Sequence, residues 1–461
     1  ITTNATPTQV KEVFNNFRVI DTGIKHGTVT VLIDKEPIEI TTYRSEGTYT
    51  DNRHPDSVTF SKSLSDDVIR RDFTMNAIAY DFSSGFCDLV GGLKDIENKT
   101  IRCIGDAETR FREDALRILR ALRFSSVLGF TIEKNTKNAI HKCKDLLKNI
   151  SAERIQVEFV KLICGENAYN VLHEFSDVIA VFIPEIAFCV NFEQKNRHHC
   201  YDVYTHSLKA LEKSKPDPVI RLAVFFHDIG KPYVAHFDEK GEQHYYGHPK
   251  KSAEITEKIL TRLRFDNNTK NKVVTLVKFH DSPIMLSDSI SPDKKRLKRI
   301  MSQIGEEMIF NLIHIKYCDN SAQSPEYFRG NEFYERTYDM INEILTEQEI
   351  IPANGHTPAN AVEENYIAPT CTENGNKDVV VYCSVCDEEI SRTTETINAT
   401  GHADNDGDGY CDADNELLDP SVECDHACHK GGISRFIWKI INFFKKLLGL
   451  NKTCDCGVAH Y

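Results

Sequence analysis

The sequence predicts an α+β chain: a small strand-containing N-terminal part, then a mostly helical body, then an irregular, cysteine-rich tail. Three observations predict this order. β-branched residues crowd the segments 28–33 and 38–42, which is typical of paired strands. Helical segments begin near Phe111 and recur as far as the stretch "FYERTYDMINEILTEQEI" at 333–350. Charge and cysteine usage then change abruptly near residue 350.

That change in composition separates two kinds of sequence. The chain has 461 residues, enough for two to four domains. Residues 351–461 contain 18 Asp and Glu against 8 Lys and Arg, whereas the rest has 51 against 48. The tail also holds 8 of the 15 cysteines. The body therefore resembles a reduced, cytosolic protein, and the tail a metal-bound or disulfide-linked segment. No apolar run is long enough to span a bilayer.

The first predicted element is a β-hairpin with a turn at Asp34–Pro37. Glu39 lies between Ile38 and Ile40, so strand alternation puts its carboxylate on the face opposite the two isoleucines. A solvated strand face is the simpler interpretation, and a functional carboxylate is the alternative.

Two further motifs carry charged groups in regular patterns. They are "RRDFTMNA" at 70–77 and "EDALRILRALRF" at 113–124. On a helix starting near Phe111, Asp114 and Arg117 share a face, and Arg120 and Arg123 extend it as a row of cations. Surface helices often carry such pairs for solubility, so this pattern by itself leaves the function open.

Together these motifs resemble the class II tRNA nucleotidyltransferases, the CCA-adding enzymes related to bacterial poly(A) polymerase. The resemblance runs from "ITTNATP" to "SAERIQVEFVKL", residues 1–162. It implies a polymerase-beta-like head, tRNA as the primer, CTP and ATP as substrates, and Mg²⁺ as the cofactor. It also implies a set of nucleotide-binding residues: Arg71, Asp72 and Asn76 at the ribose and triphosphate, Glu113, Asp114, Arg117 and Arg120 at the base-selecting helix, and Arg154 as its brace.

The resemblance also implies that part of the catalytic site is missing. In the family, two metal-holding carboxylates form a "DxD" directly before sequence like "ITTNATP", and a "GGxVRD" segment lies further upstream. Glu39 matches the third, separately placed carboxylate, and residues 43–60 match a mobile loop. One carboxylate cannot hold two divalent ions against their hydration. We therefore expect a truncated head, with polymerase activity lost in the chain as given.

A second group of motifs consists of histidines and aspartates. The residues are His206, His227, Asp228, His248, His280 and Asp319. Each histidine alone is most simply a satisfied core or surface residue. In this order they resemble the HD phosphohydrolases, an all-helical metal-binding superfamily. His206, His227, Asp228 and Asp319 then correspond to its ligand set, and His248 and His280 to the extra histidines of its two-metal members.

Imidazole and carboxylate ligands suit a divalent transition metal such as Mn, Fe or Ni, or Mg²⁺. The resemblance implies phosphatase or 2′,3′-cyclic phosphodiesterase activity. A fold kept only as a scaffold is the alternative.

The tail offers two further candidate metal sites. Cys371, Cys383 and Cys386 contain one CxxC, which fits half a zinc ribbon or a disulfide hairpin equally well. Asp404, Asp406 and Asp408 have the spacing of a Ca²⁺ loop, although Asn415 replaces the glutamate expected at its last position. The cationic stretch "SRFIWKIINFFKKLLGL" at 434–450 predicts an amphipathic helix for a membrane surface or its own domain.

We therefore predict six segments. They are a truncated head (1–82), a helical neck and body (83–195), an HD domain (196–330), a helical linker (331–352), an acidic Cys-rich segment (353–432) and an amphipathic helix with the C-terminal tail (433–461). The predicted function is CCA addition to tRNA together with HD phosphohydrolase activity. The alternatives are an HD phosphohydrolase without polymerase activity and a secreted or surface binding module defined by the tail. We expect a cytoplasmic location, although the tail hints at an exported origin. The oligomeric state stays open.

Overall fold

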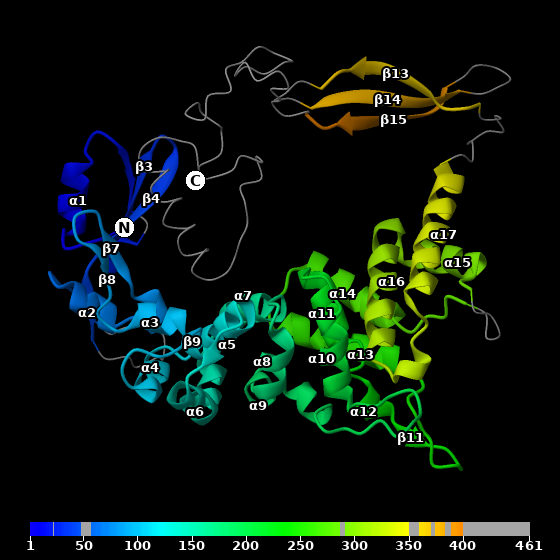
Figure 1. Cartoon of the computed structure of the whole chain (residues 1–461), viewed down its shortest axis with the longest axis horizontal. Helices are drawn as coiled ribbons and strands as arrows, with labels where there is room; N and C mark the ends of the chain where they lie inside the picture. Colours follow the sequence, from blue (N-terminus) through cyan, green and yellow to red (C-terminus); the bar gives the residue numbers. More distant parts are fainter. Residues whose placement is uncertain are drawn as a thin grey trace. The chain divides into compact units, whose positions relative to one another are not determined.

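The computed structural model describes residues 1–21, 23–47, 57–285, 291–349, 359–369, 374–382 and 389–399. The chain divides into two compact units, Ile1–Arg336 and Thr337–Tyr461; Figure 1 labels their elements. None of the helices in these ranges is both long and apolar enough to cross a membrane.

The first unit begins with a four-stranded sheet in the order β1–β4–β3–β2. β1 joins β4 in parallel, and the other pairs are antiparallel. The side chains of Val29, Val31 and Ile40 are buried against Val10 of α1, which forms the small core of the head. The elements are β1 (Thr2–Thr3), α1 (Pro7–Val13), β2 (Arg18–Ile20), η1 (Ile24–His26), β3 (Thr28–Ile33) and β4 (Glu36–Thr42).

The predicted hairpin is confirmed, but its turn is shorter than expected. The second strand begins at Glu36, two residues before the predicted start. Asp34 and Lys35 both have positive φ values, 50° and 68°. Two consecutive residues in this region form the tight turn whose twist matches that of the flanking strands, so no further loop residues are needed.

Short strands and helices then connect the head to a helical neck. The elements are β5 (Arg44–Glu46), β6 (Val58–Phe60), α2 (Leu64–Ile69), η2 (Thr74–Asn76), β7 (Ala79–Asp81), β8 (Gly85–Cys87), α3 (Gly92–Glu97), β9 (Thr100–Ile101), α4 (Ala107–Glu113), α5 (Leu116–Leu128), β10 (Thr131–Ile132), α6 (Lys134–Cys143), η3 (Lys144–Asn149) and α7 (Ala152–Ile163). β5 pairs with β6 at the base of the segment 43–60 that was predicted to be a mobile loop.

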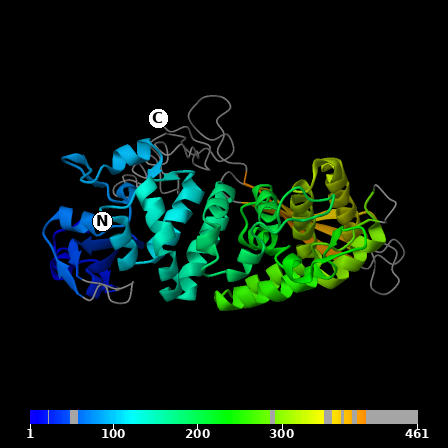
Figure 2. The same cartoon turned by 90° about the horizontal axis from the view of Figure 1, so that it is seen from below.

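Within the neck, α5 and α7 pack side by side (Figures 1 and 2). Leu119 and Leu122 of α5 and Phe159 and Leu162 of α7 are fully buried. The Ser126 hydroxyl at the end of α5 donates a hydrogen bond to the Leu162 carbonyl, 2.6 Å away. The apolar residues spaced along both helices thus pack α5 against α7, and this helix pair carries the charged motifs.

The rest of the first unit is helical. The elements are α8 (Ala168–Glu174), α9 (Ser176–Ile179), η4 (Pro184–Phe188), α10 (Val203–Glu212), α11 (Pro218–Phe226), α12 (Lys231–Val234), β11 (His236–Phe237), β12 (Gln243–His244), α13 (His248–Arg262), α14 (Asn267–Phe279), α15 (Lys294–Ile304), α16 (Glu306–Ser321) and η5 (Pro325–Tyr327). α10, α11, α14 and α16 contact one another around buried leucines such as Leu222 and Leu276. This cluster supports the second group of motifs.

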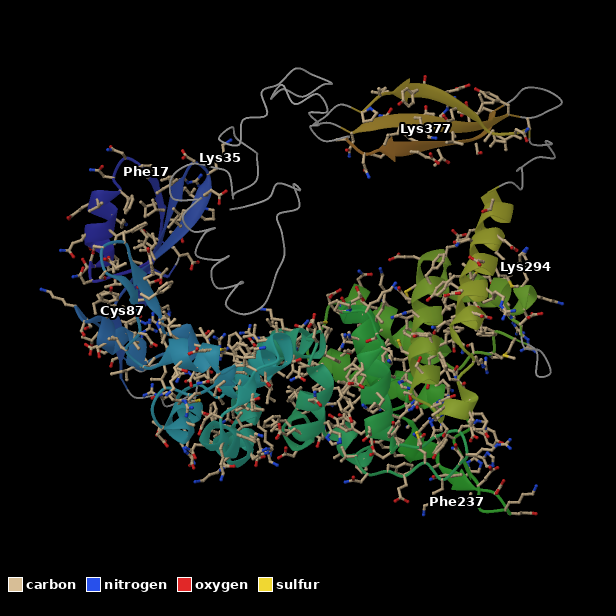
Figure 3. All side chains as sticks on the ribbon, in the orientation of Figure 1. Phe17, Lys35, Cys87, Phe237, Lys294 and Lys377 are labelled. Atoms are coloured by element: carbon tan, nitrogen blue, oxygen red, sulfur yellow. The ribbon has the colours of Figure 1, made fainter. Side chains whose placement is uncertain are left out.

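The second unit corrects the expectation of an irregular segment after residue 353. α17 (Asn331–Glu349) crosses the boundary between the units, and an antiparallel sheet follows in the order β13 (Val362–Ile367), β14 (Gly375–Tyr382) and β15 (Glu389–Ile397). Lys377 lies on the central strand (Figure 3). Valine and threonine supply strand propensity here. Arg392 adds cross-strand support, because it forms ion pairs with Asp378 at 2.9 Å and Glu364 at 3.0 Å.

Candidate nucleotide pocket and metal centre

The first candidate site is a cavity of about 500 Å³ between the start of the head sheet and the neck. Six of the predicted nucleotide-binding residues line it: Arg71, Asp72, Asn76, Asp114, Arg117 and Arg120. Thr2, Thr41, Arg70 and Phe124 complete the lining. The structure therefore brings together motifs that lie about forty residues apart in the chain. Glu113 and Arg154 do not line the cavity.

Asp72 organises one wall of this cavity. Its Oδ1 accepts hydrogen bonds from the Phe73 backbone at 2.8 Å and from Asn76 Nδ2 at 3.1 Å. Its Oδ2 accepts from Arg120, with Nε at 2.7 Å and Nη2 at 2.6 Å. Both oxygens are occupied, so Asp72 orients Asn76 and Arg120 and is not itself a free ligand.

Arg71 provides a positive charge at the same wall. Two of its nitrogens contact Asp67 Oδ2, at 2.9 and 3.3 Å, and a third donates to the Asn76 carbonyl at 3.2 Å. Burial opposes the charge on Asp67, but hydrogen bonds from Arg70 and Arg71 outweigh this and lower its pKa. The ionised carboxylate fixes the guanidinium of Arg71, whose side chain is still 32% exposed and can meet a phosphate.

The base-selecting segment differs from the predicted continuous helix. α4 ends at Glu113, Asp114 has an extended backbone, and α5 starts at Leu116. The Asp114 carboxylate accepts the Leu116 N–H at 3.1 Å, because an aspartate side chain readily satisfies a free N–H at a helix start. The expectation that Asp114 and Arg117 share one helix face is therefore wrong.

Because of this break, Asp114 and Arg117 reach the cavity while different neighbouring residues hold each of them. Glu113 Oε2 accepts from Arg117 Nη1 at 2.8 Å, and the Arg70 carbonyl accepts from Arg117 Nη2 at 2.8 Å. Arg154 contacts Asp114 with Nη2 at 3.0 Å from Oδ2 and Nη1 at 3.4 Å from Oδ1. Glu113 and Arg154 thus position the residues beside them, without lining the cavity themselves.

The arginines of the predicted row on α5 are paired with carboxylates. Arg120 is bound to Asp72, and Arg123 Nε lies 3.1 Å from Glu158 Oε2 of α7. Phe124, which the sequence reasoning missed, lines the cavity with its ring edge-on to Phe73 and the Arg123 guanidinium 4.0 Å from its centroid. Its only sequence signal is its position seven residues after Arg117, on the same side of α5.

Glu39 lies exposed on β4, on the strand face shared with Thr41. Its carbonyl accepts a hydrogen bond from the Ile1 amino group at 2.7 Å. Among the described residues, Glu39 belongs to none of the groups of three or more side chains that could hold a metal ion. The side chains that the structure describes at the head therefore do not fit a pair of Mg²⁺ ions.

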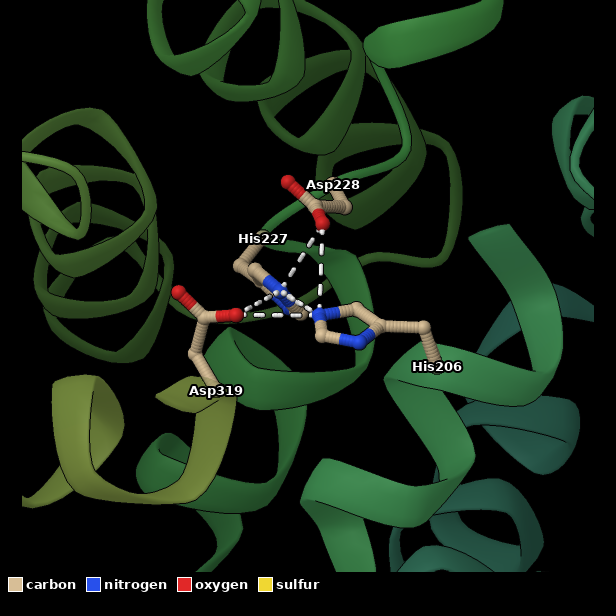
Figure 4. A group of neighbouring side chains, drawn as sticks. All are labelled: His206, His227, Asp228 and Asp319. Carbon is tan, nitrogen blue, oxygen red and sulfur yellow. Dashed lines mark hydrogen bonds and ion pairs between the residues drawn. The ribbon is translucent and has the colours of Figure 1, made fainter. Parts of the chain in front are cut away.

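The second candidate site is at the centre of the helical cluster, and all six predicted histidines and aspartates meet there. His206 lies on α10, His227 caps the end of α11 with Asp228 next to it, and Asp319 lies on α16 (Figure 4). These four form one group of possible metal ligands, and Asp228 with His248 and His280 forms a second. The side chains of His206, His227, Asp228 and His280 are almost completely buried.

The orientation of the four histidines suits metal binding. Each Nδ1 faces a backbone carbonyl at 2.7 to 3.2 Å: Ala322 for His206, Val224 for His227, Tyr245 for His248 and Val277 for His280. A carbonyl only accepts, so Nδ1 carries the proton and the Nε2 lone pair of a neutral ring points inward.

The Nε2 atoms face each other in pairs. They are 3.3 Å apart between His206 and His227 and 3.2 Å apart between His248 and His280. Two such lone pairs cannot bond to each other, and a cation between them satisfies both. The donor set thus fits two metal ions.

Asp228 links the two groups. Its Oδ2 lies 3.2 Å from His227 Nε2 and 3.5 Å from His206 Nε2. Its Oδ1 lies 3.3 Å from His248 Nε2 and 3.6 Å from His280 Nε2. Ligands on one first-row ion are about 3 Å apart when bonds are about 2.1 Å, so one carboxylate oxygen can serve each ion. Asp319 Oδ1, 2.9 Å from His206 Nε2, completes the first group.

The buried carboxylates of this centre favour bound cations. Burial disfavours a charged His227, but Asp228 and Asp319 outweigh it and raise its pKa to about 10. Burial also opposes both carboxylates, yet the facing histidines hold the pKa of Asp319 well below its usual range, and His227 and Lys231 do so for Asp228. Lys231 supplies one positive charge beside Asp228, so the two buried anions need further positive charge from protons on the histidines or from bound metal.

A cavity of about 560 Å³ opens onto this centre. Lys231 Nζ lies at its wall, 2.6 Å from Asp228 Oδ2 and 2.8 Å from Gln194 Oε1. His199 Nε2 is 3.3 Å from the same Nζ, and burial together with Lys231 lowers the pKa of His199 to about 2. Neither Gln194 nor His199 was singled out from the sequence.

A third group of possible ligands, Asp238, Glu242 and His244, lies on the β11–β12 hairpin and is largely exposed. Asp238 Oδ1 accepts from the Lys240 and Glu242 backbones at 2.9 Å, and His244 Nε2 lies 3.0 Å from Asp238 Oδ2. These bonds explain the group as the hydrogen bonding of a turn. The predicted tail ligands Cys371, Cys383, Cys386, Asp404, Asp406 and Asp408 all lie outside the described residues.

Comparison with known protein families gives three matches in chain order. Residues 1–102 match the family model "Poly A polymerase head domain". Residues 129–189 match "Probable RNA and SrmB- binding site of polymerase A", and residues 197–316 match "HD domain". The chain thus resembles a poly A polymerase-type head and RNA-binding region followed by an HD domain. Asp319 lies three residues beyond the end of the HD match.

Similar proteins specify the family further. The CCA-adding enzyme of Lactobacillus helveticus is 49% identical over 188 residues, which cover 41% of this chain and 47% of that protein. The CCA-adding enzyme of Leuconostoc citreum is 53% identical over 172 residues, covering 37% and 42%. The crystal structure of the Bacillus stearothermophilus CCA-adding enzyme in complex with CTP superposes with a TM-score of 0.54 at 25% identity, covering 77% of this chain and 76% of that one.

This chain is therefore similar to the CCA-adding enzymes over the matched regions. The sequence matches span less than half the length of these two curated relatives. The predicted family and α+β fold class are confirmed. The roles of individual residues and the boundaries of the six segments stay predictions.

Proposed function

We propose that this chain carries the nucleotide-selecting and RNA-holding parts of an enzyme that adds CCA to the 3′ end of tRNA. The observation that carries the proposal is the break between α4 and α5, which presents Asp114 and Arg117 to one cavity on separate supports. A carboxylate offers two acceptors and a guanidinium offers paired donors, so together they can bind the hydrogen-bonding edge of a base without a nucleic-acid template.

In this proposal different residues of the cavity bind the triphosphate, the ribose and the base. Arg71 meets the triphosphate, and Asn76, held by Asp72, meets the ribose. Asp114 and Arg117 accept CTP and ATP and reject bases whose edges place donors and acceptors differently. Support comes from the family and from the Bacillus stearothermophilus CCA-adding enzyme, whose crystal structure is a complex with CTP. tRNA as the partner and a cytoplasmic location follow from the same proposal.

The side chains described at the head do not fit a metal pair, so we assign no transfer step to them. We expect the chain as given to bind CTP and tRNA without extending the tRNA. Fluorescence anisotropy with labelled tRNA lacking CCA, against a random RNA of equal length, tests the proposal. Preference for the tRNA supports it, and equal affinity contradicts it. Extension of the tRNA with CTP, ATP and Mg²⁺ would show that the head is complete.

We further propose that the helical cluster is a metal-dependent hydrolase of phosphate esters. His206, His227, Asp228 and Asp319 would hold one divalent ion and Asp228, His248 and His280 a second. A bound metal pair activates water as a nucleophile and offsets the negative charge that develops on phosphorus. Lys231, which the Gln194 side chain holds at the cavity wall, would orient the phosphate.

Phosphate release from simple phosphate esters in the presence of Mn²⁺, Ni²⁺ or Mg²⁺ tests this second function. We expect turnover that the double change His227→Ala with Asp228→Ala abolishes. The control is His141→Ala, which removes a half-exposed histidine on α6 away from the cluster. A chain that binds metal yet releases no phosphate with any of these ions would instead support a scaffold role.

A further inference from the structure

The sheet of the second unit has two edge strands that differ in regularity (Figure 1). Among the described residues, β13 and β15 each pair only with the central strand β14. The register of β13 shifts between Glu364 and Ile367, and Asn365 inside this shift has a positive φ of 50°. A bulge of this kind bends an edge strand and hinders another strand from pairing with it. The edge of β13 is therefore poorly suited to a partner strand.

The edge of β15 has no such interruption from Ser391 to Ile397. These seven consecutive residues pair with β14 in one unbroken antiparallel register, from Val381 back to Gly375. Residues 392–396 are exposed, and because strand side chains alternate, they are exposed on both faces of the sheet. The segment contains neither proline nor lysine, which commonly protect an open edge. Within the part of the chain that the structure describes, β15 thus offers a regular row of backbone N–H and C=O groups to a further strand.

The two charged residues of this segment form ion pairs within their own sheet. Arg392 contacts Asp378 at 2.9 Å and Glu364 at 3.0 Å. Glu395 lies 3.4 Å from Lys377 of the central strand. Because opposite charges offset both groups, they repel an approaching strand less than isolated charges do. The segment can therefore accept a strand that places uncharged side chains opposite Arg392 and Glu395.

The sequence of this segment meets that requirement when it pairs with itself, antiparallel and centred on Thr394. All seven residues of the regular segment then have a partner, and no like charges lie opposite each other. The facing pairs are Ser391 with Ile397, Arg392 with Thr396, Thr393 with Glu395, and Thr394 with its own copy. Centring the pairing on Glu395 instead would place two glutamates opposite each other, which is destabilising. Centring it on Thr393 would pair only five of the seven residues.

We propose that β15 pairs with β15 of a second copy of this chain, centred on Thr394, so that the two sheets become one continuous sheet. The pairing is symmetric, because the same edge of both copies meets across a two-fold axis at Thr394. This inference is independent of the functions proposed for the head and the helical cluster. A single strand edge gives a small interface, so we expect a reversible dimer in the micromolar range.

Sedimentation equilibrium of the full chain over a range of concentrations tests the pairing, in the presence of a reductant that prevents disulfides between chains. Thr394→Lys places two lysines opposite each other at the two-fold axis and should weaken the dimer at least about 5-fold. Thr396→Glu places a carboxylate opposite Arg392 of the other copy, twice in each dimer, and should strengthen the dimer by about 5-fold. Thr396→Lys should weaken it instead.

Tyr366→Lys is the matched control, because it adds the same charge to the edge of β13, where the Tyr366 side chain is 62% exposed. It should leave the dimer unchanged. Strengthening by Thr396→Glu is a result that misfolding cannot produce, and together with weakening by Thr394→Lys it supports the proposal. A chain that stays monomeric at every concentration overturns the proposal. A dimer that Thr394→Lys leaves intact, that Thr396→Glu does not strengthen or that Tyr366→Lys dissociates overturns it as well.

Discussion

Replacing Arg154 with alanine tests how Asp114 is positioned. Arg154 makes two contacts to the Asp114 carboxylate, at 3.0 and 3.4 Å, and the two side chains are 26% and 20% exposed. A partly exposed ion pair of this kind contributes about 1 kcal/mol. If that energy holds Asp114 in its base-binding orientation, its loss weakens CTP binding about 5-fold. Arg154→Lys keeps the charge but cannot make both contacts, so we expect an intermediate effect.

The assay is calorimetric titration with CTP, alongside thermal unfolding. The matched control is Arg262→Ala, which removes a similar two-contact pair, at 2.7 and 2.8 Å, between α13 and Glu185 of η4. It should lower stability by a comparable amount and leave CTP binding unchanged. A folded Arg154→Ala chain with wild-type CTP affinity would refute the positioning role.

Three further predictions concern the metal centre and its surroundings. His280→Ala should lower the metal content from two ions to one per chain, as measured by elemental analysis, because it removes one of the three ligands of the second group. The control His244→Ala should leave two ions. An unchanged metal content in His280→Ala would count against the two-ion assignment. Metal binding at pH 7.5 should release about one proton, because His227, whose pKa is raised to about 10, is charged without metal and must be neutral to bind it. The affinity for the metal should therefore rise with pH up to about 10. Calorimetric titration in buffers of different ionisation enthalpy measures the number of protons released, and a value of zero would contradict the prediction. Gly230→Ala should lower the Tm by at least about 2 °C, because the added Cβ would lie 2.5 Å from the Ser252 backbone nitrogen on α13. A backbone atom cannot move aside as a side chain can. An unchanged Tm would show that α13 shifts to make room.

The sequence predicts those parts of the fold and sites for which residue type and order along the chain are enough to identify the neighbours. Alternating β-branched residues predict the hairpin that carries Glu39. The order of His206, His227, Asp228 and Asp319 predicts a cluster whose members come from α10, α11 and α16. In both cases a local pattern or a family motif specifies the neighbours.

Features that depend on tertiary contacts could not be predicted in this way. The helix break at Asp114 is stabilised because its carboxylate accepts the Leu116 N–H at the start of α5 while Arg154 of α7 contacts the same carboxylate, and helical periodicity alone favours a continuous helix. Phe124 and His199 belong to no charged pattern, and only the fold brings them to a cavity. The three-stranded sheet was missed because the cysteine and charge content of this segment was given more weight than the valines of β14; the ion pairs of Arg392 support the sheet.

The most direct test of the central claim is equilibrium binding of the four ribonucleoside triphosphates to the purified chain. If Asp114 and Arg117 select the base, CTP and ATP should bind at least about 10-fold more tightly than GTP and UTP, a difference of about 1.4 kcal/mol. Asp114→Ala should reduce that difference. Equal affinity of the unmodified chain for all four nucleotides would contradict the proposal that this cavity selects the nucleotide.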